Sequence, residues 1–342
     1  MVKLEITPYN RNWLDCYLNN LIAILMTRNA KYEQLIGYVS SRFEMPLPAA
    51  GKLTDEEYTG YRGAGAYLPH IRKGISEALL QRYLDSEEIA ITPDTDIIGT
   101  VKELLRDGRY CFVRVNRYYY PGCYDYMTQR LIHPSFIYGY DDEAQKLLLI
   151  EDYIQVGRFE RYEISYNDFL IAYRSIEPEE RFALAVSASE AEFEAPLELL
   201  KANIDAQLTD EEASDDHFVY YKGVGGIRRF REHFFESIAG VTDVSTNVFN
   251  RVSTLVFYPD RNRMLIRDLR AAGLLDSGDG EQLASGFDDL YRLWGGIRAK
   301  ILQYYMRDNK PDLHSYFANV DASLRECEAE RELLERLRKK LG

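Results

Sequence analysis

The chain lacks the features of proteins that bind nucleic acid and of proteins that bind or span membranes. Among its 342 residues, 55 Asp and Glu outnumber 42 Lys and Arg, which gives a net charge of −13. Nucleic acid and anionic membranes both attract basic surfaces, so we expect no nucleic acid and no membrane as a partner. No apolar run reaches about 18 residues, the length typical of a transmembrane helix. The first residues also lack the basic start and apolar centre of a signal peptide, and we therefore expect a cytoplasmic protein.

Cysteine and histidine are scarce as well. The four cysteines form no Cys-x-x-Cys pair, and none of the five histidines lies at metal-ligand spacing from a cysteine. These absences argue against a disulfide framework and a zinc site, and we expect no bound metal or other cofactor. Apolar residues make up 46% of the chain, which is enough for an ordinary packed core.

One cysteine stands at the start of an apolar helical pattern. Leucine and isoleucine follow it at spacings of three and four, which predicts one face of a buried helix: Leu18, Leu21, Ile22 and Leu25. Asn12 or Asp15 can cap this helix, which places Cys16 in its first turn. There the helix dipole stabilises a thiolate and lowers the pKa of the thiol, as a nucleophile requires. A small apolar residue packed in a core is the alternative interpretation of Cys16.

A predicted β-hairpin carries a histidine and a carboxylate. Residues 131–140 and 146–153 have the composition of two strands, and the polar residues 141–145 form a turn between them. Pairing the strands about this turn puts His133 roughly opposite Asp152 or Tyr153. The carboxylate can therefore reach the imidazole and fix its tautomer.

A cysteine nucleophile needs such a base, and the base needs an orienting group. We therefore predict a catalytic triad of Cys16, His133 and Asp152. The chain order Cys, His, Asp, with the cysteine on an early helix, is that of papain-like folds. Cys123, in a turn-rich segment with several tyrosines, is the rival nucleophile, but no helix begins there.

Further residues are predicted to contact substrate. The backbone N–H of Cys16 is a natural oxyanion donor, and Asn10 is our prediction for the second donor, with Asn12 as the alternative. Both asparagines can also serve as turn or capping residues. Tyr119 and Tyr138 are predicted substrate contacts from the tyrosine-rich part of the chain.

The pattern changes character near residue 195. Residues 1–194 combine an early helix with several strands, which predicts an α+β domain. Residues 195–342 read as an all-helical domain whose last helix, at 316–341, has a charged surface. Residues 45–67 are rich in glycine and proline and predict a long loop that forms a wall of the site. Residues 71–84 predict a helix.

The chain resembles the butirosin-biosynthesis protein H family of papain-like cysteine proteins. The resemblance rests on the Cys16 helix, on His-Pro-Ser-Phe-Ile-Tyr-Gly-Tyr-Asp-Asp at 133–142 and on Leu-Ile-Glu-Asp at 149–152. The segment Gly-Gly-Ile-Arg-Arg-Phe at 225–230 and the helix with Trp294 look like that family's helical C-terminal domain. The resemblance implies a papain-like N-terminal domain and an acyltransferase of antibiotic or other natural-product biosynthesis.

The family's chemistry would give each triad residue a role. The resemblance implies that an acyl or aminoacyl group moves from the phosphopantetheine thioester of an acyl or peptidyl carrier protein to a small-molecule amine, forming an amide. Cys16 would attack the thioester, His133 would act as base and then acid, and Asp152 would orient His133. The phosphopantetheine belongs to the partner, so the chain itself needs no cofactor.

Two other functions use the same residues differently. A cysteine peptidase or amidase would resolve the acyl-enzyme with water, and a binding or scaffold protein would merely pack Cys16. Carrier proteins are usually acidic, so docking would need a local basic patch, for which Arg228, Arg229 and Arg231 are candidates. The charged last helix would suit a homodimer contact or a free surface.

Overall fold

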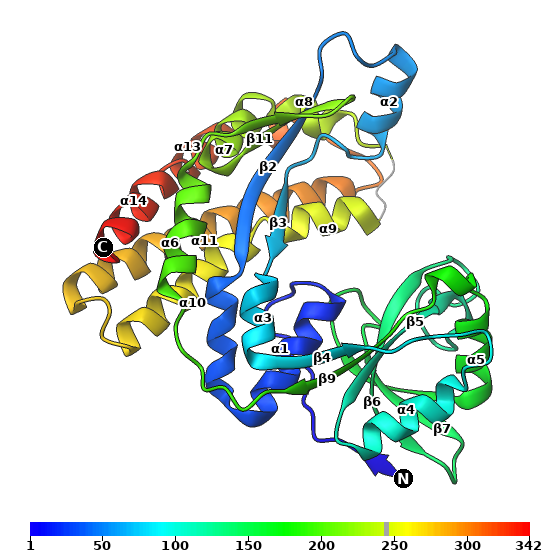
Figure 1. The fold of residues 1–342 in the computed structure, drawn as a ribbon. Helices are drawn as coiled ribbons and strands as arrows, with labels where there is room; N and C mark the ends of the chain where they lie inside the picture. Colours follow the sequence, from blue (N-terminus) through cyan, green and yellow to red (C-terminus); the bar gives the residue numbers. More distant parts are fainter. Residues whose placement is uncertain (243–245) are drawn as a thin grey trace. The chain divides into compact units, whose positions relative to one another are not determined.

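The computed structural model describes residues 1–242 and 246–342, and the chain divides into two compact units (Figure 1). The first unit joins Met1–Leu35 to Ser76–Glu194, and the second joins Ile36–Ile75 to Ala195–Gly342. The junction after Glu194 coincides with the predicted domain boundary. Residues 36–75, however, belong to the second unit, which corrects the predicted extent of the first domain.

The first unit is built on a seven-stranded sheet in which all pairs are antiparallel. The order is β4-β9-β5-β6-β7-β8, and β1 pairs with β6 at one end. The strands are β1 (Val2–Lys3), β4 (Leu84–Glu88), β5 (Tyr110–Asn116), β6 (Ile132–Asp141), β7 (Lys146–Glu151), β8 (Glu160–Ser165) and β9 (Ala183–Ala188). The predicted hairpin is therefore present as β6 and β7.

Helices cover both faces of this sheet. They are α1 (Cys16–Arg28), α3 (Glu77–Tyr83), α4 (Ile97–Arg106) and α5 (Tyr166–Arg174), with short 3₁₀ segments η1 (Ala30–Tyr38), η2 (Arg117–Tyr119) and η3 (Pro178–Glu180). The apolar stripes of α4 and α5 share one core with Val113 and Val115 of β5 and Leu149 of β7. On the opposite face Tyr17 of α1 contacts Phe112, with ring centroids 4.8 Å apart. Because side chains alternate along a strand, this division assigns each strand residue to a face.

Helix α1 begins where the sequence predicts. The Asp15 carboxylate accepts hydrogen bonds from the backbone N–H groups of Tyr17 and Leu18, at 2.9 and 2.6 Å. These are two of the donors that a helix start leaves without intrahelical partners. The cap makes Cys16 the first helical residue.

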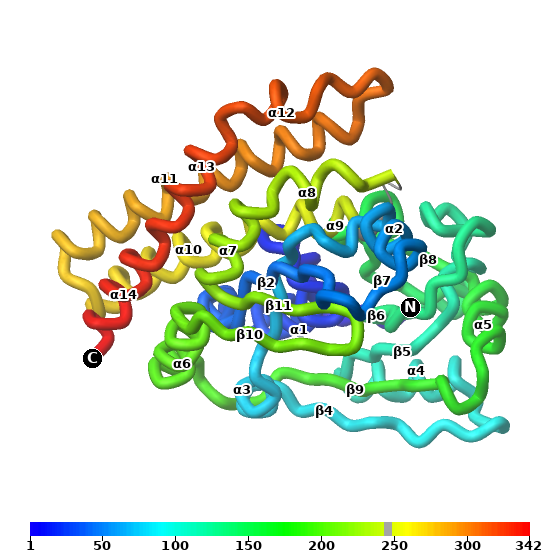
Figure 2. The backbone as a smooth tube through the Cα atoms, turned by 90° about the horizontal axis from the view of Figure 1, so that it is seen from above, coloured from blue at the N-terminus to red at the C-terminus, as the bar shows by residue number. Residues whose placement is uncertain are grey.

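The second unit combines a four-stranded antiparallel sheet, of order β10-β11-β2-β3, with a set of helices. Its strands are β2 (Ser40–Pro48), β3 (His70–Gly74), β10 (Glu212–Ser214) and β11 (Phe218–Lys222). Its helices are α2 (Asp55–Gly63), α6 (Leu197–Leu208), α7 (Gly223–Glu232), α8 (Phe234–Ala239), α9 (Thr246–Thr254), α10 (Phe257–Ala271), α11 (Ser277–Tyr305), α12 (Leu313–Tyr316), α13 (Val320–Cys327) and α14 (Glu330–Lys340). In Figure 2 the last helices run alongside α11.

Several predictions for the second unit are wrong in detail. The C-terminal region is largely helical, but β10 and β11 make it mixed rather than all-helical. The last helix is broken into α12, α13 and α14, and Leu334 and Leu337 of α14 are fully buried, so this helix is part of the core. No pattern predicted that β11 pairs with β2 from far earlier in the chain.

The glycine-rich segment was expected to be a loop and contains α2. Thr54 caps this helix in a capping box with Glu57, a signal that the surrounding glycines obscured. The helix predicted at 71–84 is the strand β3 followed by the short helix α3. The expectation of an α+β fold is confirmed. Within the two described ranges, no helix has both the length and the apolar character needed to span a membrane.

Candidate active site

The three residues of the predicted triad lie together in the first unit. The Cys16 sulfur, a ring nitrogen of His133 and a carboxylate oxygen of Asp152 are all within 4.8 Å of one another. Cys16 is the first residue of α1, His133 lies near the start of β6, and Asp152 directly follows β7. Three separate elements therefore bring a thiol, an imidazole and a carboxylate to one point.

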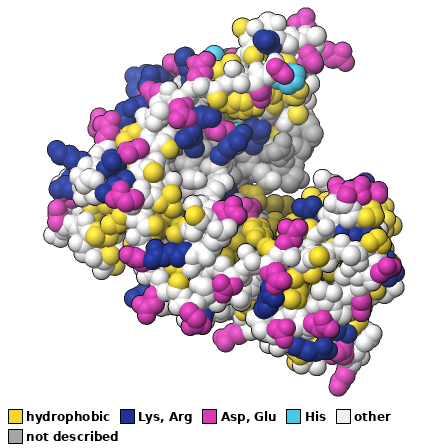
Figure 3. All heavy atoms as spheres, in the orientation of Figure 1, with side chains coloured by type: hydrophobic (Ala, Val, Ile, Leu, Met, Phe, Trp, Pro, Cys, Tyr) yellow, Lys and Arg dark blue, Asp and Glu magenta, His cyan; other side chains and the backbone are white. Residues whose placement is uncertain are grey.

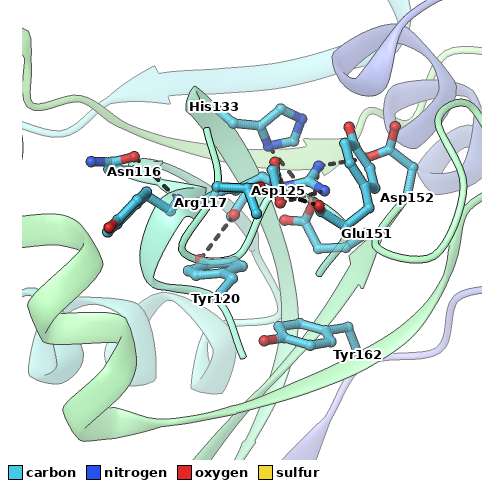
Figure 4. A network of polar contacts seen from close by, with 12 residues as sticks. Asn116, Arg117, Tyr120, Asp125, His133, Glu151, Asp152 and Tyr162 are labelled. Atoms are coloured by element: carbon cyan, nitrogen blue, oxygen red, sulfur yellow. Dashed lines mark hydrogen bonds and ion pairs between the residues drawn. The ribbon is translucent and has the colours of Figure 1, made fainter. Parts of the chain in front are cut away.

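A fully buried arginine, which the sequence analysis missed, organises the surroundings of the triad (Figure 4). Arg117 lies 2.5 Å from Asp152, 3.1 Å from Asp125 and 3.5 Å from Glu151. Burial opposes the charge of Arg117, but the three carboxylates outweigh it and raise the pKa of the guanidinium. The ring of Tyr124 lies over the guanidinium, 5.0 Å from it. A buried cation of this kind is stable only because these partners surround it.

The signal for this network is present in the strand pattern. Arg117 directly follows the largely buried strand β5, and a charge at such a position must find partners or solvent. Glu151 continues the inward-facing series of Leu147 and Leu149, whose side chains point to the core with α4 and α5. Glu151 therefore lies on the face that packs against α4 and α5.

Asp152 is held by two partners. Its Oδ1 accepts from Arg117, and its Oδ2 accepts from the backbone N–H of Gly157 at 3.0 Å. Gly157 has a φ of +77°, and a Cβ there would meet the ring of Trp13 at 3.0 Å, so a side chain at this position would be strained and crowded. The carboxylate is fixed in orientation by these contacts.

His133 is buried and neutral. Burial, and secondarily the charge of Arg117, lower the pKa of His133 to about 3. Its Nδ1 lies 3.7 Å from Oε2 of Glu151. Burial raises the pKa of Glu151 to about 8, against the effect of Arg117. A neutral imidazole can accept a proton from a thiol.

The expected lowering of the Cys16 pKa is wrong. Burial, followed by the charges of Asp152 and Glu151, raises the pKa of the thiol, and only Arg117 among the nearby charges opposes this. Desolvation and like charge therefore oppose the thiolate at this helix start. The resting site holds a neutral thiol beside a neutral imidazole.

Cysteine, histidine and aspartate are also residue types that bind zinc. Here both oxygens of Asp152 are engaged, and the guanidinium of Arg117 lies 2.5 Å from one of them. A fixed positive charge at this distance opposes a divalent cation. The arrangement suits proton transfer better than metal binding.

The predicted oxyanion donor Asn10 has another role. Its amide donates to the carbonyl of Phe159 at 2.8 Å and accepts from the N–H of Phe159 at 2.7 Å. This pair ties the N-terminal segment to the start of β8, so we assign Asn10 a structural role. The N–H of Cys16, at the first helical position, has no intrahelical acceptor and remains the natural oxyanion donor.

The two predicted tyrosine contacts lie elsewhere. Tyr119 is partly buried and packs on the core with α4 and α5. Tyr138 is buried beside Lys3, Arg161 and Glu163 on β1 and β8. Tyr124 is an aromatic residue near the triad; it is 41% exposed, and its pKa is raised by burial and by Asp152.

The other cysteines are packed in cores. Cys111 and Cys327 are fully buried, and Cys123 is 6% exposed. Burial raises the pKa of Cys123 to about 12. The structure therefore gives no support to Cys123 as a rival nucleophile.

The predicted basic patch is neutralised by acidic partners. Arg228 pairs with Asp210, Arg229 pairs with Glu232, and Arg231 pairs with two carboxylates of α13 and its C-terminal end. On the face drawn in Figure 3, basic and acidic side chains are interspersed. These arginines do not form the free cationic surface that was expected.

Comparisons with known proteins give this chain no relative, since no family model and no curated protein matches it. The resemblance described above therefore stays a prediction. The functional argument rests on the chemistry of the site.

Proposed function

We propose that the protein is a cysteine-dependent acyltransferase in which Cys16 carries the acyl group. The observation that supports this most directly is the convergence of Cys16, His133 and Asp152 within 4.8 Å. A thiol, a base and a buried carboxylate in mutual reach are the parts that covalent acyl transfer uses. The proposed donor is the phosphopantetheine thioester of a carrier protein, and the proposed acceptor is a small-molecule amine.

The proposed reaction has two balanced halves. The Cys16 thiol gives its proton to His133 as its sulfur attacks the thioester carbon, and the carrier thiolate leaves with the proton from the imidazolium. The acceptor amine then attacks the Cys16 thioester, loses a proton to His133 and forms the amide. The Cys16 thiolate takes that proton back.

The burial of the site supports transfer over free reaction in water. A neutral thiol and a neutral imidazole separate charge only as the sulfur attacks. Exchange between two thioesters is nearly balanced in energy, so positioning and exclusion of water are the main tasks. The backbone N–H of Cys16 would stabilise the oxyanion.

Intact-protein mass tests the proposal. Wild type and Cys16→Ala are incubated with an acyl-loaded carrier protein or a simple acyl thioester, first without and then with amines. We expect an acyl adduct on wild type that is absent from Cys16→Ala and is discharged by an amine. Discharge by water alone would identify a hydrolase, and an adduct that persists in Cys16→Ala would contradict the proposal.

A further inference from the structure

The carboxylate predicted to orient His133 is already occupied. Asp152 accepts from Arg117 through one oxygen and from the Gly157 N–H through the other. Both contacts come from groups that cannot move far, because Arg117 is fully buried and Gly157 lies against Trp13. Asp152 is therefore fixed as a partner of Arg117.

A second carboxylate faces His133 directly. Glu151 is 1% exposed, and its Oε2 lies 3.7 Å from Nδ1 of His133. Val115 pairs with His133, and the β6–β7 register sets Phe136 opposite Ile150, so His133 and Glu151 lie on the same face of the sheet. Figure 4 shows the two side chains turned toward each other.

His133 lacks partners that its burial requires. Neither ring nitrogen has a hydrogen-bond partner among the described residues. A buried polar atom without a partner is costly, and hydrogen bonds at catalytic groups are often long before substrate binds. Oε2 of Glu151, 3.7 Å from Nδ1, is the carboxylate oxygen placed to supply one of these partners.

We propose that Glu151, rather than Asp152, is the positioning residue of His133, and that its ionisation decides which ring nitrogen carries the proton. This inference rests on the proposed function for its catalytic consequence. Ionised Glu151 accepts from Nδ1–H, which leaves Nε2 as the unprotonated ring nitrogen that can act as a base. Protonated Glu151 donates to Nδ1 instead, which leaves the proton on Nε2 and removes the base.

The surroundings of Glu151 determine the pH at which Glu151 ionises and the ring proton of His133 moves. The charged and titratable groups near it are Arg117, Asp125, His133, Asp152 and Cys16, and the hydroxyl and thiol groups are those of Tyr120, Cys123, Ser135 and Tyr162. Burial favours the protonated form, and Arg117 favours the ionised form. The net result is a raised pKa of about 8, so the ring proton is expected to move between pH 7 and 9.

Long-range ¹H–¹⁵N spectra of the histidine rings test the inference without any substrate. His133→Gln identifies the signals of His133 among the five histidines. In wild type we expect the Nε2–H tautomer near pH 6 and the Nδ1–H tautomer near pH 9. Glu151→Gln abolishes this change, whereas Asp152→Asn and Asp125→Asn retain it. Glu151→Asp retains a pH-dependent change with a shifted midpoint.

Two results would overturn the inference. One is a wild-type tautomer that does not change with pH, a result that needs no variant to fold. The other is a change that is lost in Asp152→Asn but kept in Glu151→Gln. If Glu151→Gln abolishes the tautomer change of His133 while no acyl adduct forms on Cys16, the coupling of Glu151 to His133 holds and the proposed function fails.

Kinetics give the second readout. At pH 9, where Glu151 of the wild type is ionised, Glu151→Gln is expected to lower kcat for acyl transfer about 100-fold with little change in KM, since it removes the correctly protonated base rather than a substrate contact. Glu330→Gln replaces an equally buried glutamic acid of the second unit and is the matched control for the loss of a buried carboxyl. An equal fall in kcat in both variants would contradict a positioning role.

Discussion

At the scale of single residues, the site is defined by the charges around Cys16. The thiol is half-buried at a helix start, a position that favours the thiolate, yet burial and the three carboxylates of Asp152, Glu151 and Asp15 oppose it. Arg117 compensates only in part, because it is shared among three acidic partners. The sum of these effects raises the pKa of Cys16 and keeps the thiol protonated at rest.

This charge balance predicts how Cys16 reacts with a small electrophile. We expect the rate of alkylation by iodoacetamide to rise steadily from pH 7 to pH 10, because a raised pKa leaves little thiolate at neutral pH. The rate is followed by intact-protein mass, and Cys16→Ala reports the labelling of the three buried cysteines. A plateau that begins near pH 5 would instead indicate a preformed ion pair of thiolate and imidazolium.

At the scale of elements, α1 positions the sulfur through its N-terminal cap. The Asp15 carboxylate accepts from Tyr17 and Leu18 and so fixes where the helix begins. The same carboxylate contributes to the raised pKa of Cys16. One side chain therefore has a structural effect and an electrostatic effect that substitution can separate.

Two substitutions of Asp15 should differ in their effects on stability and on the reactivity of Cys16. Asp15→Ala removes the cap and should lower the free energy of unfolding by about 1 kcal/mol, measured by urea unfolding. Asp15→Asn keeps an oxygen acceptor and removes the charge, so it should leave stability nearly unchanged and speed the alkylation of Cys16. Equal destabilisation by both variants would show that the side chain does not act as a cap.

The β6–β7 hairpin shows what element-scale patterns can and cannot predict. Its strands, its turn and the approach of His133 to Asp152 follow from alternation and turn composition. The choice between Glu151 and Asp152 does not, because neighbouring residues on a strand point to opposite faces. Both carboxylates are buried near His133, and only the tertiary structure shows that Glu151 faces Nδ1 while Asp152 is held by Arg117 and Gly157.

At the scale of the whole molecule, each unit buries a glutamic acid. Glu151 lies in the first unit and Glu330 in the second, and burial raises the pKa of each to about 8. Both glutamic acids have an ordinary pKa of 4.5, so between pH 4.5 and 8 the folded chain holds protons that the unfolded chain has lost. Their contribution to stability is complete below pH 4.5 and falls as the pH rises toward 8.

We therefore expect the free energy of unfolding to decrease between pH 6.5 and 8, by about 1.4 kcal/mol per pH unit for each glutamic acid. His133 opposes this decrease near pH 6.5, because its pKa is lowered to about 3 while the unfolded imidazole, with an ordinary pKa of 6.5, still binds protons there; its effect fades as the pH rises toward 8. Urea unfolding across this range measures the effect, and Glu151→Gln and Glu330→Gln should each reduce the slope. A slope unchanged in both variants would contradict the assignment.

The sequence by itself determined the local parts of this protein. The Cys16 helix and its Asp15 cap, the β6–β7 hairpin and the α+β class follow from spacing, capping and turn residues, which act over a few positions. The tertiary structure alone decided that residues 36–75 join the second unit and that Arg117 gathers Asp125, Glu151 and Asp152. Strand pairing and charge burial depend on which distant segments exclude water together, and no local pattern encodes that choice.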